Sequence, residues 1–474
     1  MKVKLYFTGC LILLFAVSSI AQKTTITFSN KTYQNDSISV YCFSDYITET
    51  KKQLASGKVS DSGYFGCSFK INTITQVFIP IGIFQLSLYT EPGKTYHLLI
   101  PPKKKLDVAD ELNPFFVPVE ILPGIKGTDS TELNSLINSF DIKYENFISK
   151  NFKYIYYSAR KSVPDSAIAS LEKQFSWTHN LFFKKYIEFK FNMLRYMAYE
   201  RDDSYIIKYR FNNQSVYLNN PSYMSMFNDL FKHYFSVSVS KNWGDKIMDD
   251  IAKSKSPWEL HQTFKFNPAL SNDTLIDLII LKGIHDAFYA DKISEYRTFP
   301  RKQLLMTLDS MICCAMAPEY KQIAQNIKTK VIQMSPGGDA PDFSLPNLDS
   351  VPINLSELRG KYLYINFNDI RSYSCQNEMT LLSTISKKFP KELEIVTIMC
   401  NGTVSQVREF CKINDFKWQF LAAEKPGQVI NNYHIKALPS YFLIDPYGKI
   451  VLSPCPGPDS NFGSVFVSIL NGRN

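Results

Sequence analysis

The order of apolar and polar residues divides the chain into three regions. Residues 22–105 alternate with a period of two, which is typical of strands with one buried face, and Ile38, Val40 and Cys42 share such a face. Similar short runs, separated by turn residues, occupy residues 63–69, 77–79, 85–89 and 96–100. We therefore predict a small antiparallel β-sandwich over residues 22–105.

From residue 128 onward the apolar residues recur at helical spacing. The first predicted helix has its apolar face at Leu133, Leu136, Ile137, Phe140, Tyr144, Phe147 and Ile148. A second helix is predicted to begin at Pro164 and to continue through Phe182, and others are predicted over 275–288 and 302–316. Aromatic residues on such faces are more often part of a core than of a cofactor pocket. We therefore predict a mainly α-helical domain, with a linker, over residues 106–335.

Residues 336–474 alternate between short apolar strands and helical runs. The strand-like segments are residues 362–367, 394–399, 441–445 and 449–452, and helical runs separate the first three. Strands that alternate with helices indicate an α/β domain. The predicted fold class is therefore multidomain, with an N-terminal β-sandwich, an α-helical middle domain and a C-terminal α/β domain.

The first residues have the pattern of a secretory signal. Lys2 and Lys4 precede an apolar run over residues 11–17, and small residues lead to a cleavage position after Ala21. A lipid anchor at Cys10 is the less favoured alternative, because most of the apolar residues follow this cysteine. We expect residues 1–21 to be a cleaved signal peptide that directs the protein to the periplasm or cell envelope, with no integral membrane segment after cleavage.

Composition excludes several other classes of protein. The chain of 474 residues is too long for one core, and its 45% hydrophobic and 20% charged residues are typical of globular proteins. The net charge of +9 involves no dense basic block with interleaved aromatics, so we expect no nucleic-acid partner. Without His ligand spacing or a Gly-rich phosphate loop, we expect no metal and no cofactor. The adjacent Cys313 and Cys314 suit a soft metal, but we favour small apolar side chains in a helix.

One segment carries the candidate chemistry. The strand-like residues 361–367 are followed by Ser372-x-x-Cys375 and then by a helical run over residues 381–389. A Cys-x-x-Cys sequence between a strand and a helix is the redox motif of thioredoxin-like proteins. Here the second sulfur is present, and an oxygen replaces the first.

Four segments together resemble a known family. They are residues 340–345 (Ala-Pro-Asp-Phe-Ser-Leu), 355–361 (Leu-Ser-Glu-Leu-Arg-Gly-Lys), Cys375-x-x-Glu378-Met379 and 438–445 (Leu-Pro-Ser-Tyr-Phe-Leu-Ile-Asp). In their order and spacing, residues 338–460 are similar to the exported thioredoxin-like proteins of the TlpA and ResA type, which are related to the AhpC/TSA peroxiredoxins. The order of the whole chain resembles multidomain envelope proteins of this group. The resemblance implies a thioredoxin-like fold for residues 336–474.

The resemblance also implies roles for individual residues. Ser372 occupies the position of the attacking cysteine, and Cys375 occupies that of the resolving cysteine. Glu378 matches the acidic residue that controls proton transfer to the sulfurs. Leu438 and Pro439 match the substrate-facing loop with its cis-proline. The family's two tryptophan positions are occupied here by Asn368 and Arg371.

The serine at position 372 changes the expected chemistry. A thiolate at a helix N-terminus attacks a disulfide, whereas a hydroxyl does not ionise near neutral pH and forms no mixed disulfide. Ser372 is instead expected to cap the helix. Cys375 is then either a half-buried structural thiol, which we favour, or a monothiol that exchanges with a partner.

Three other cysteines are candidate disulfide partners in an exported protein. Cys400 follows the strand over residues 394–399 and is the best internal partner for Cys375, because the carboxyl ends of neighbouring parallel strands meet at one edge of a sheet. Cys42 and Cys67 lie in predicted strands, where they form either a disulfide or two buried thiols.

Two functions remain open on the sequence. The first is a relative of the thiol–disulfide oxidoreductases that has lost two-cysteine exchange and retains at most monothiol exchange through Cys375. The alternative is a non-catalytic binding or assembly protein of the cell envelope that uses the thioredoxin groove. The expected partner is an envelope protein or a redox donor.

Overall fold

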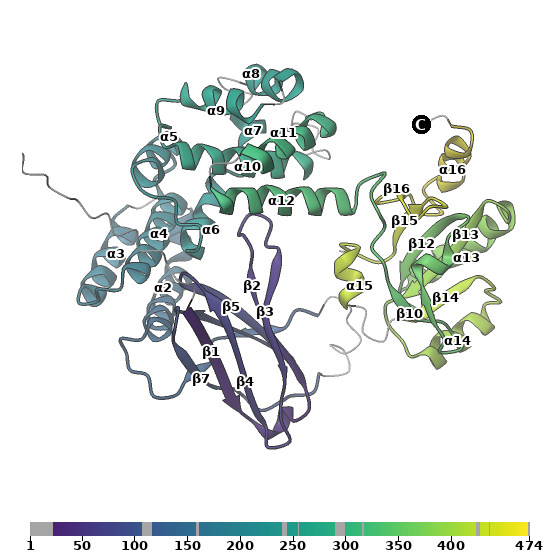
Figure 1. The fold of residues 1–474 in the computed structure, drawn as a ribbon, viewed down its shortest axis with the longest axis horizontal. Coiled ribbons are helices and arrows are strands. Elements are labelled where there is room, and N and C mark those ends of the chain that lie inside the picture. The colour runs from purple at the N-terminus through teal and green to yellow at the C-terminus, as the bar shows by residue number, and fades with distance from the viewer. Residues whose placement is uncertain are drawn as a thin grey trace, which may run out of the picture.

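The computed structural model describes residues 22–106, 116–157, 161–238, 244–254, 256–289, 299–314, 317–422, 427–435 and 437–472. The predicted signal peptide, residues 1–21, lies outside them. Figure 1 shows a sheet-rich N-terminal region against a helical region, and a C-terminal α/β region beyond helix α12 (Pro318–Gln333). None of the helices in these ranges combines the length and hydropathy needed to cross a membrane.

The N-terminal region consists of two packed sheets. Their strands are β1 (Gln22–Ser29), β2 (Ser37–Phe43), β3 (Lys51–Lys58), β4 (Tyr64–Ile71), β5 (Thr75–Ile81), β6 (Phe84–Thr90), β7 (Thr95–Leu99), β8 (Val119–Ile121) and β9 (Gly124–Ile125). One sheet has the order β4-β1-β7-β9, and the other has the order β3-β2-β5-β6-β8. Inward-facing side chains of both sheets form one apolar core that includes Ile26, Val40, Phe65 and Leu88.

The strand pattern of this region was largely predictable. The face of Ile38, Val40 and Cys42 is confirmed, since all three side chains are buried. The expected all-antiparallel pairing is wrong, because β1 pairs with β7, and β6 with β8, in parallel. Such partners are not joined by a hairpin, so local alternation does not reveal them. Strands β8 and β9 also extend the sheets past residue 105, and they are too short to produce a periodic pattern.

The middle region is helical. Its elements are α2 (Leu133–Tyr156), α3 (Ser162–Phe175), α4 (Leu181–Ala198), α5 (Asp203–Ile206), the π-helical η2 (Ile207–Asn212), α6 (Pro221–Leu230), α7 (Tyr234–Ser238), α8 (Gly244–Asp249), the π-helical η4 (Asp250–Ser254), α9 (Pro257–Lys265), α10 (Asp273–Tyr289), α11 (Arg301–Cys314) and α12. The predicted apolar face of α2 is confirmed, with Phe147 and Ile148 partly buried and the other five buried. The predicted continuation of the second helix through Phe182 is wrong, because α3 ends at Phe175 and the Asn180 side chain caps α4.

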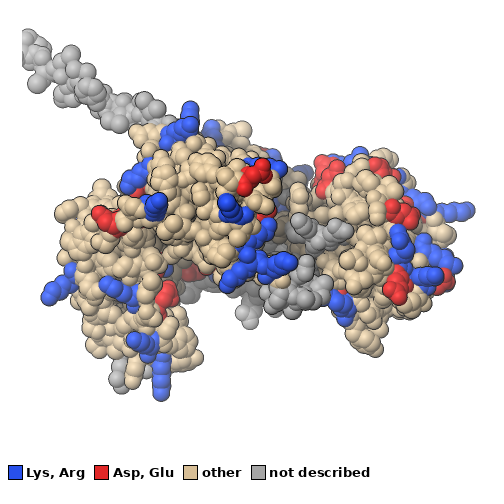
Figure 2. Space-filling model, turned by 90° about the horizontal axis from the view of Figure 1, so that it is seen from below, with Lys and Arg blue, Asp and Glu red and all other residues tan. Residues whose placement is uncertain are grey.

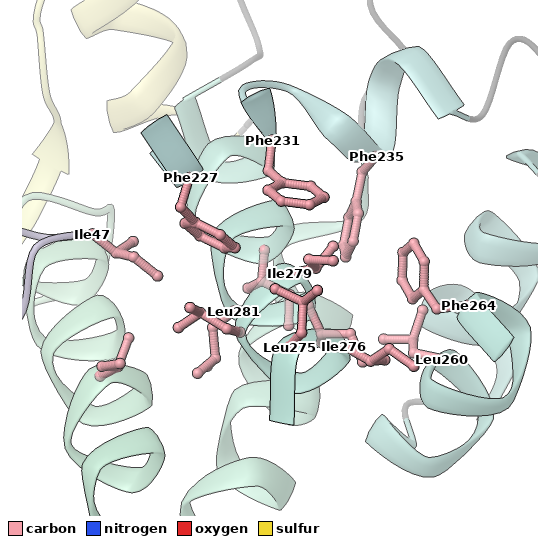
Figure 3. Packing of buried hydrophobic residues seen from close by; sticks show 14 of the residues in the cluster. Ile47, Phe227, Phe231, Phe235, Leu260, Phe264, Leu275, Ile276, Ile279 and Leu281 are labelled. Carbon is pink, nitrogen blue, oxygen red and sulfur yellow. The ribbon is translucent and has the colours of Figure 1, made fainter. Parts of the chain in front are cut away.

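The sandwich is joined to the helical region by the loop between β2 and β3. Ile47 at the tip of this loop is buried in the core of the helices, and Figure 3 shows it facing the side of Phe227. The carboxylate of Asp45 accepts hydrogen bonds from the backbone of Ile47 and Thr48 and from the Asn326 side chain on α12. The two regions therefore share an apolar contact and a buried polar contact.

The C-terminal region is a thioredoxin-like α/β domain. It consists of β10 (Ser344–Pro346), β11 (Pro352–Asn354), η5 (Leu355–Leu358), β12 (Tyr362–Asn368), α13 (Tyr373–Lys388), β13 (Leu393–Met399), α14 (Val404–Ile413), β14 (Gln419–Ala422), α15 (Gly427–Asn432), β15 (Ser440–Ile444), β16 (Ile450–Leu452) and α16 (Phe462–Leu470). The main sheet has the order β14-β13-β12-β15-β16, in which β12, β13 and β14 are parallel and β15 and β16 are antiparallel to their neighbours. The four predicted strands of this domain are confirmed, and the sequence pattern did not indicate β14.

Candidate functional site

The candidate site begins where β12 ends and α13 starts. Ser372 is the N-cap of α13, with an extended backbone (φ −84°, ψ 120°). Its Oγ accepts a hydrogen bond of 3.4 Å from the backbone N–H of Cys375. The predicted capping role of Ser372 is therefore confirmed, and its oxygen occupies the position in which the resemblance places the attacking sulfur.

The Cys375 thiol lies one turn into α13 and is fully buried, in an apolar cluster with Tyr364 on β12. Burial has the largest effect on its pKa and raises it, and the negative charges of Asp369 and Glu378 raise it further. Hydrogen bonds to Ser372 and to the backbone of Asp369 lower the pKa by a smaller amount. Because the thiolate is the nucleophile, these surroundings disfavour attack by Cys375 at neutral pH. The thiol is therefore shielded from solvent and from approaching disulfides in this structure.

Glu378 lies one turn further along α13 and is half-buried. Burial raises the pKa of its carboxyl group, and the negative charge of Asp459 raises this pKa further. The hydrogen bond donated by the Tyr441 hydroxyl on β15 lowers the same pKa, but by less than burial raises it. Gly457 allows the close approach, since a Cβ there would lie 2.9 Å from Asp459 Oδ1 and 3.0 Å from Glu378 Oε2. Glu378 is therefore held by Tyr441 and can keep a proton at higher pH than an exposed glutamate.

The predicted substrate-facing loop lies at the same edge of the sheet. The Leu438–Pro439 peptide bond is cis, as the resemblance implied. Pro439 directly precedes β15, whose first residue, Ser440, pairs with Phe367 near the end of β12. The antiparallel register therefore brings the loop beside the turn that leads to Ser372, although the two are far apart in the sequence.

The candidate disulfide partners are free thiols in the structure. Cys400 packs on the face of the sheet that carries Phe367, whereas Cys375 packs on the opposite face. Burial strongly raises the pKa of Cys400. Cys42 on β2 and Cys67 on β4 belong to different sheets of the sandwich, and burial raises the pKa of Cys67 to about 11.

A buried polar chain was missed by the sequence reasoning. Asn366 and Asn368 both point to the Tyr364 side of β12, and the Asn368 amide donates a hydrogen bond to the Asn366 carbonyl oxygen. Asn366 also accepts one from Thr397 on β13 (2.9 Å), and Thr397 accepts one from Trp418 (2.8 Å). Two asparagines at alternate positions of an otherwise apolar strand were the available signal, because such side chains need buried partners.

Metal binding gains no support from the described part of the chain, which contains no group of three or more His, Cys, Asp or Glu residues that could hold an ion. The expectation that Cys313 and Cys314 serve as small apolar side chains is wrong, because both thiols are exposed at the C-terminal end of α11. The apolar face of this helix is made instead by Leu304, Leu308 and Met311. Helical phase, not residue type, decides their exposure.

Comparison with known proteins agrees with this geometry. Residues 336–453 match the model of the AhpC/TSA family. The chain is 32% identical over 128 residues to the thiol-disulfide oxidoreductase ResA of Bacillus thuringiensis subsp. konkukian, which covers 27% of this chain and 73% of that protein. It is 31% identical to ResA of Bacillus subtilis over 156 residues, 33% of this chain and 83% of that protein. The chain belongs to this family of thioredoxin-like thiol–disulfide oxidoreductases.

A solved structure is also similar to a part of the chain. The thioredoxin domain of a thiol-disulfide oxidoreductase from Bacteroides vulgatus is 23% identical, with a TM-score of 0.26. The similar part covers 28% of this chain and 96% of that domain. The family match concerns residues 336–453, so the sandwich and the helices lie outside it.

The Tyr441–Glu378 contact leads to a testable prediction. Tyr441→Phe removes the hydroxyl that stabilises the ionised carboxylate but keeps the ring that stacks on Tyr364 at 5.3 Å. We expect the pKa of Glu378 to rise further, and the loss of a charge-assisted hydrogen bond to cost about 1–2 kcal/mol at neutral pH. NMR titration of the Glu378 carboxyl carbon measures the first effect, and Tyr447→Phe on the exposed surface is the control. A pKa that stays the same or falls would contradict the assignment.

Proposed function

We propose that the chain is an exported thioredoxin-fold protein of the cell envelope that has lost two-cysteine exchange and retains at most monothiol exchange through Cys375. The observation that carries this proposal is the capping of α13 by Ser372 Oγ. Two-cysteine exchange requires a thiolate that forms a mixed disulfide and a second thiol that resolves it. A hydroxyl provides neither the ionised nucleophile nor the sulfur–sulfur bond.

The burial and the raised pKa of Cys375 limit the thiol exchange that this protein can still perform. Its sulfur is buried, and its raised pKa disfavours the thiolate. A monothiol reaction would require α13 or the Pro439 loop to move and expose the sulfur. Glu378, with its raised pKa, is the group placed to hold a proton beside it. We therefore assign Cys375 and Glu378 as the residues of any remaining exchange, with Ser372 in a structural role.

A second candidate function is non-catalytic binding of an envelope protein in the thioredoxin groove. It is favoured by Tyr373, which is 77% exposed directly after the Ser372 cap, beside a thiol that is fully buried. An exposed aromatic side chain at the first position of α13 suits contact with a polypeptide more than thiol chemistry. The sandwich and the helical region would then add contact surface.

The test combines two measurements on the protein without residues 1–21. We expect no reduction of insulin disulfides above background with a dithiol donor, in the unchanged protein and in Cys375→Ala alike. Robust turnover that Cys375→Ala abolishes would refute the loss of catalysis. Thiol trapping in envelope extract then separates the two candidates: a mixed disulfide mapped to Cys375 supports monothiol exchange, and solely non-covalent partners support the binding function.

A further inference from the structure

A cavity of about 410 Å³ lies where the sandwich meets helices α2, α4 and α6. Four tyrosines and two methionines are among the residues that line it: Tyr89, Tyr144, Tyr156, Tyr186, Met193 and Met197. The junction is closely tied, because the Asn134 side chain on α2 bonds both backbone groups of Tyr89 on β6. A cavity of this size between two regions of a chain is typical of small-molecule sites.

One wall of this cavity already holds an ammonium group. The Nζ atom of Lys190 lies over the rings of Tyr144 and Tyr186, 5.4 and 5.6 Å from their centroids. It also lies 3.8 Å from Asp141 Oδ1 and 4.0 Å from Glu145 Oε1. Aromatic faces attract cations through their quadrupole, and carboxylates add to this attraction. The cavity therefore has surroundings suited to positive charge.

The hydroxyl groups of three of the tyrosines are already bonded within the protein. The hydroxyl groups of Tyr144, Tyr186 and Tyr156 donate to the Lys190 carbonyl, to Asp141 and to the Met197 sulfur, respectively. The Ser222 hydroxyl, on a residue that is 6% exposed, lines the cavity and has no partner among the described residues. A buried polar atom without a partner costs free energy, so it indicates a bound group that completes it.

We propose that this cavity binds a small organic cation with an apolar body. The ammonium group would lie against Tyr144 and Tyr186 beside Glu145, and the apolar body would contact the two methionines, whose flexible side chains adapt to shape. Lys190, with a side chain that is 27% exposed, can swing outward to make room. An organic anion is disfavoured, because two carboxylates and one ammonium surround the site. The proposal is independent of the thioredoxin-like site.

Calorimetric titration of the protein without residues 1–21 tests this assignment, with benzyltrimethylammonium as the cation and phenylacetate as an anion of similar size. We expect saturable binding of the cation, and binding of phenylacetate at least about ten-fold weaker. Tyr156→Ser, a change at a partly exposed ring, is expected to weaken cation binding about five-fold. Tyr157→Ser is the matched control, since Tyr157 is 77% exposed and does not line the cavity.

Lys190→Met tests most directly whether the resident ammonium occupies the position proposed for the cation. It removes the resident ammonium while keeping an apolar stem, so we expect the cation to bind several-fold more tightly. Loss of cation binding in this variant, stronger binding of phenylacetate, or equal effects of Tyr156→Ser and Tyr157→Ser would each overturn the proposal. So would the lack of saturable cation binding by the unchanged protein. Circular dichroism of each variant confirms that it is folded.

Discussion

Replacing Ser372 with Cys is expected to convert a protein without insulin reductase activity into one with measurable turnover. The new sulfur would occupy the N-cap of α13, where unpaired backbone N–H groups and the helix dipole stabilise a thiolate. Cys375 would lie one turn away, in position to resolve a mixed disulfide. We expect a gain of about 100-fold or more over background, since covalent catalysis has no nucleophile in the unchanged protein.

Ser374→Cys is the matched control for this experiment. It adds a thiol next to Cys375 on the exposed side of α13, without the two-residue spacing, and is expected to leave turnover at background. Mass spectrometry shows whether a 372–375 disulfide forms in the first variant. A disulfide that forms without any gain in turnover would contradict the view that Ser372 alone blocks the cycle. It would place the loss in Asn368, Arg371 or the groove as well.

The second large effect is expected at the junction of the sandwich and the helices. Asp45→Ala removes the acceptor of two backbone N–H groups, of the Thr48 hydroxyl and of the Asn326 amide. Ile47 and Thr48 are buried, so their two backbone N–H groups would lose this acceptor, whereas the Thr48 hydroxyl and the Asn326 amide keep Thr50 and Ser44 as partners. Leaving two buried donors unpaired costs about 3–5 kcal/mol.

Scanning calorimetry measures this loss of stability as a lower midpoint temperature of the first unfolding transition. Asp36→Ala is the control, because Asp36 forms an exposed ion pair with Lys103, and such pairs contribute about 0–1 kcal/mol. If Asp45→Ala and Asp36→Ala lower the transition equally, the loop does not tie the two regions together. Separation of one transition into two in Asp45→Ala alone would show that the loop couples their unfolding.

Figure 2 shows how the charge of the chain is distributed on one face. Basic side chains are spread over this face, with a denser group between the sandwich and the thioredoxin-like domain, and acidic side chains are interspersed. The net charge of +9 is thus shared among many separate side chains, and the sequence contains no dense basic block with interleaved aromatics. The inferred cation site lies instead in a cavity, where three side chains from two helices set the local charge.

The candidate site was predictable to the extent that it is local. The turn from β12 to Ser372, the cap and the helix follow from adjacent residues, and the cis bond before Pro439 was implied by the resemblance. The hydrogen-bond partner of Glu378 was not predictable from the sequence. Tyr441 lies 63 residues away and reaches the carboxylate only through the pairing of β12 and β15. The buried Asn366–Asn368 chain likewise depends on Thr397 of β13 and on Trp418, which directly precedes β14.

The sequence by itself determined the three regions, the strand–helix frame of the site and the missing sulfur, because periodicity and turn chemistry depend on near neighbours. Only the tertiary structure decided the parallel partners of β1 and β6, the insertion of Ile47 among the helices and the burial of Cys375. It also decided that Lys190 lies over two tyrosine rings from different helices. These contacts join distant residues, and they depend on the sum of many weak packing interactions that no local pattern records.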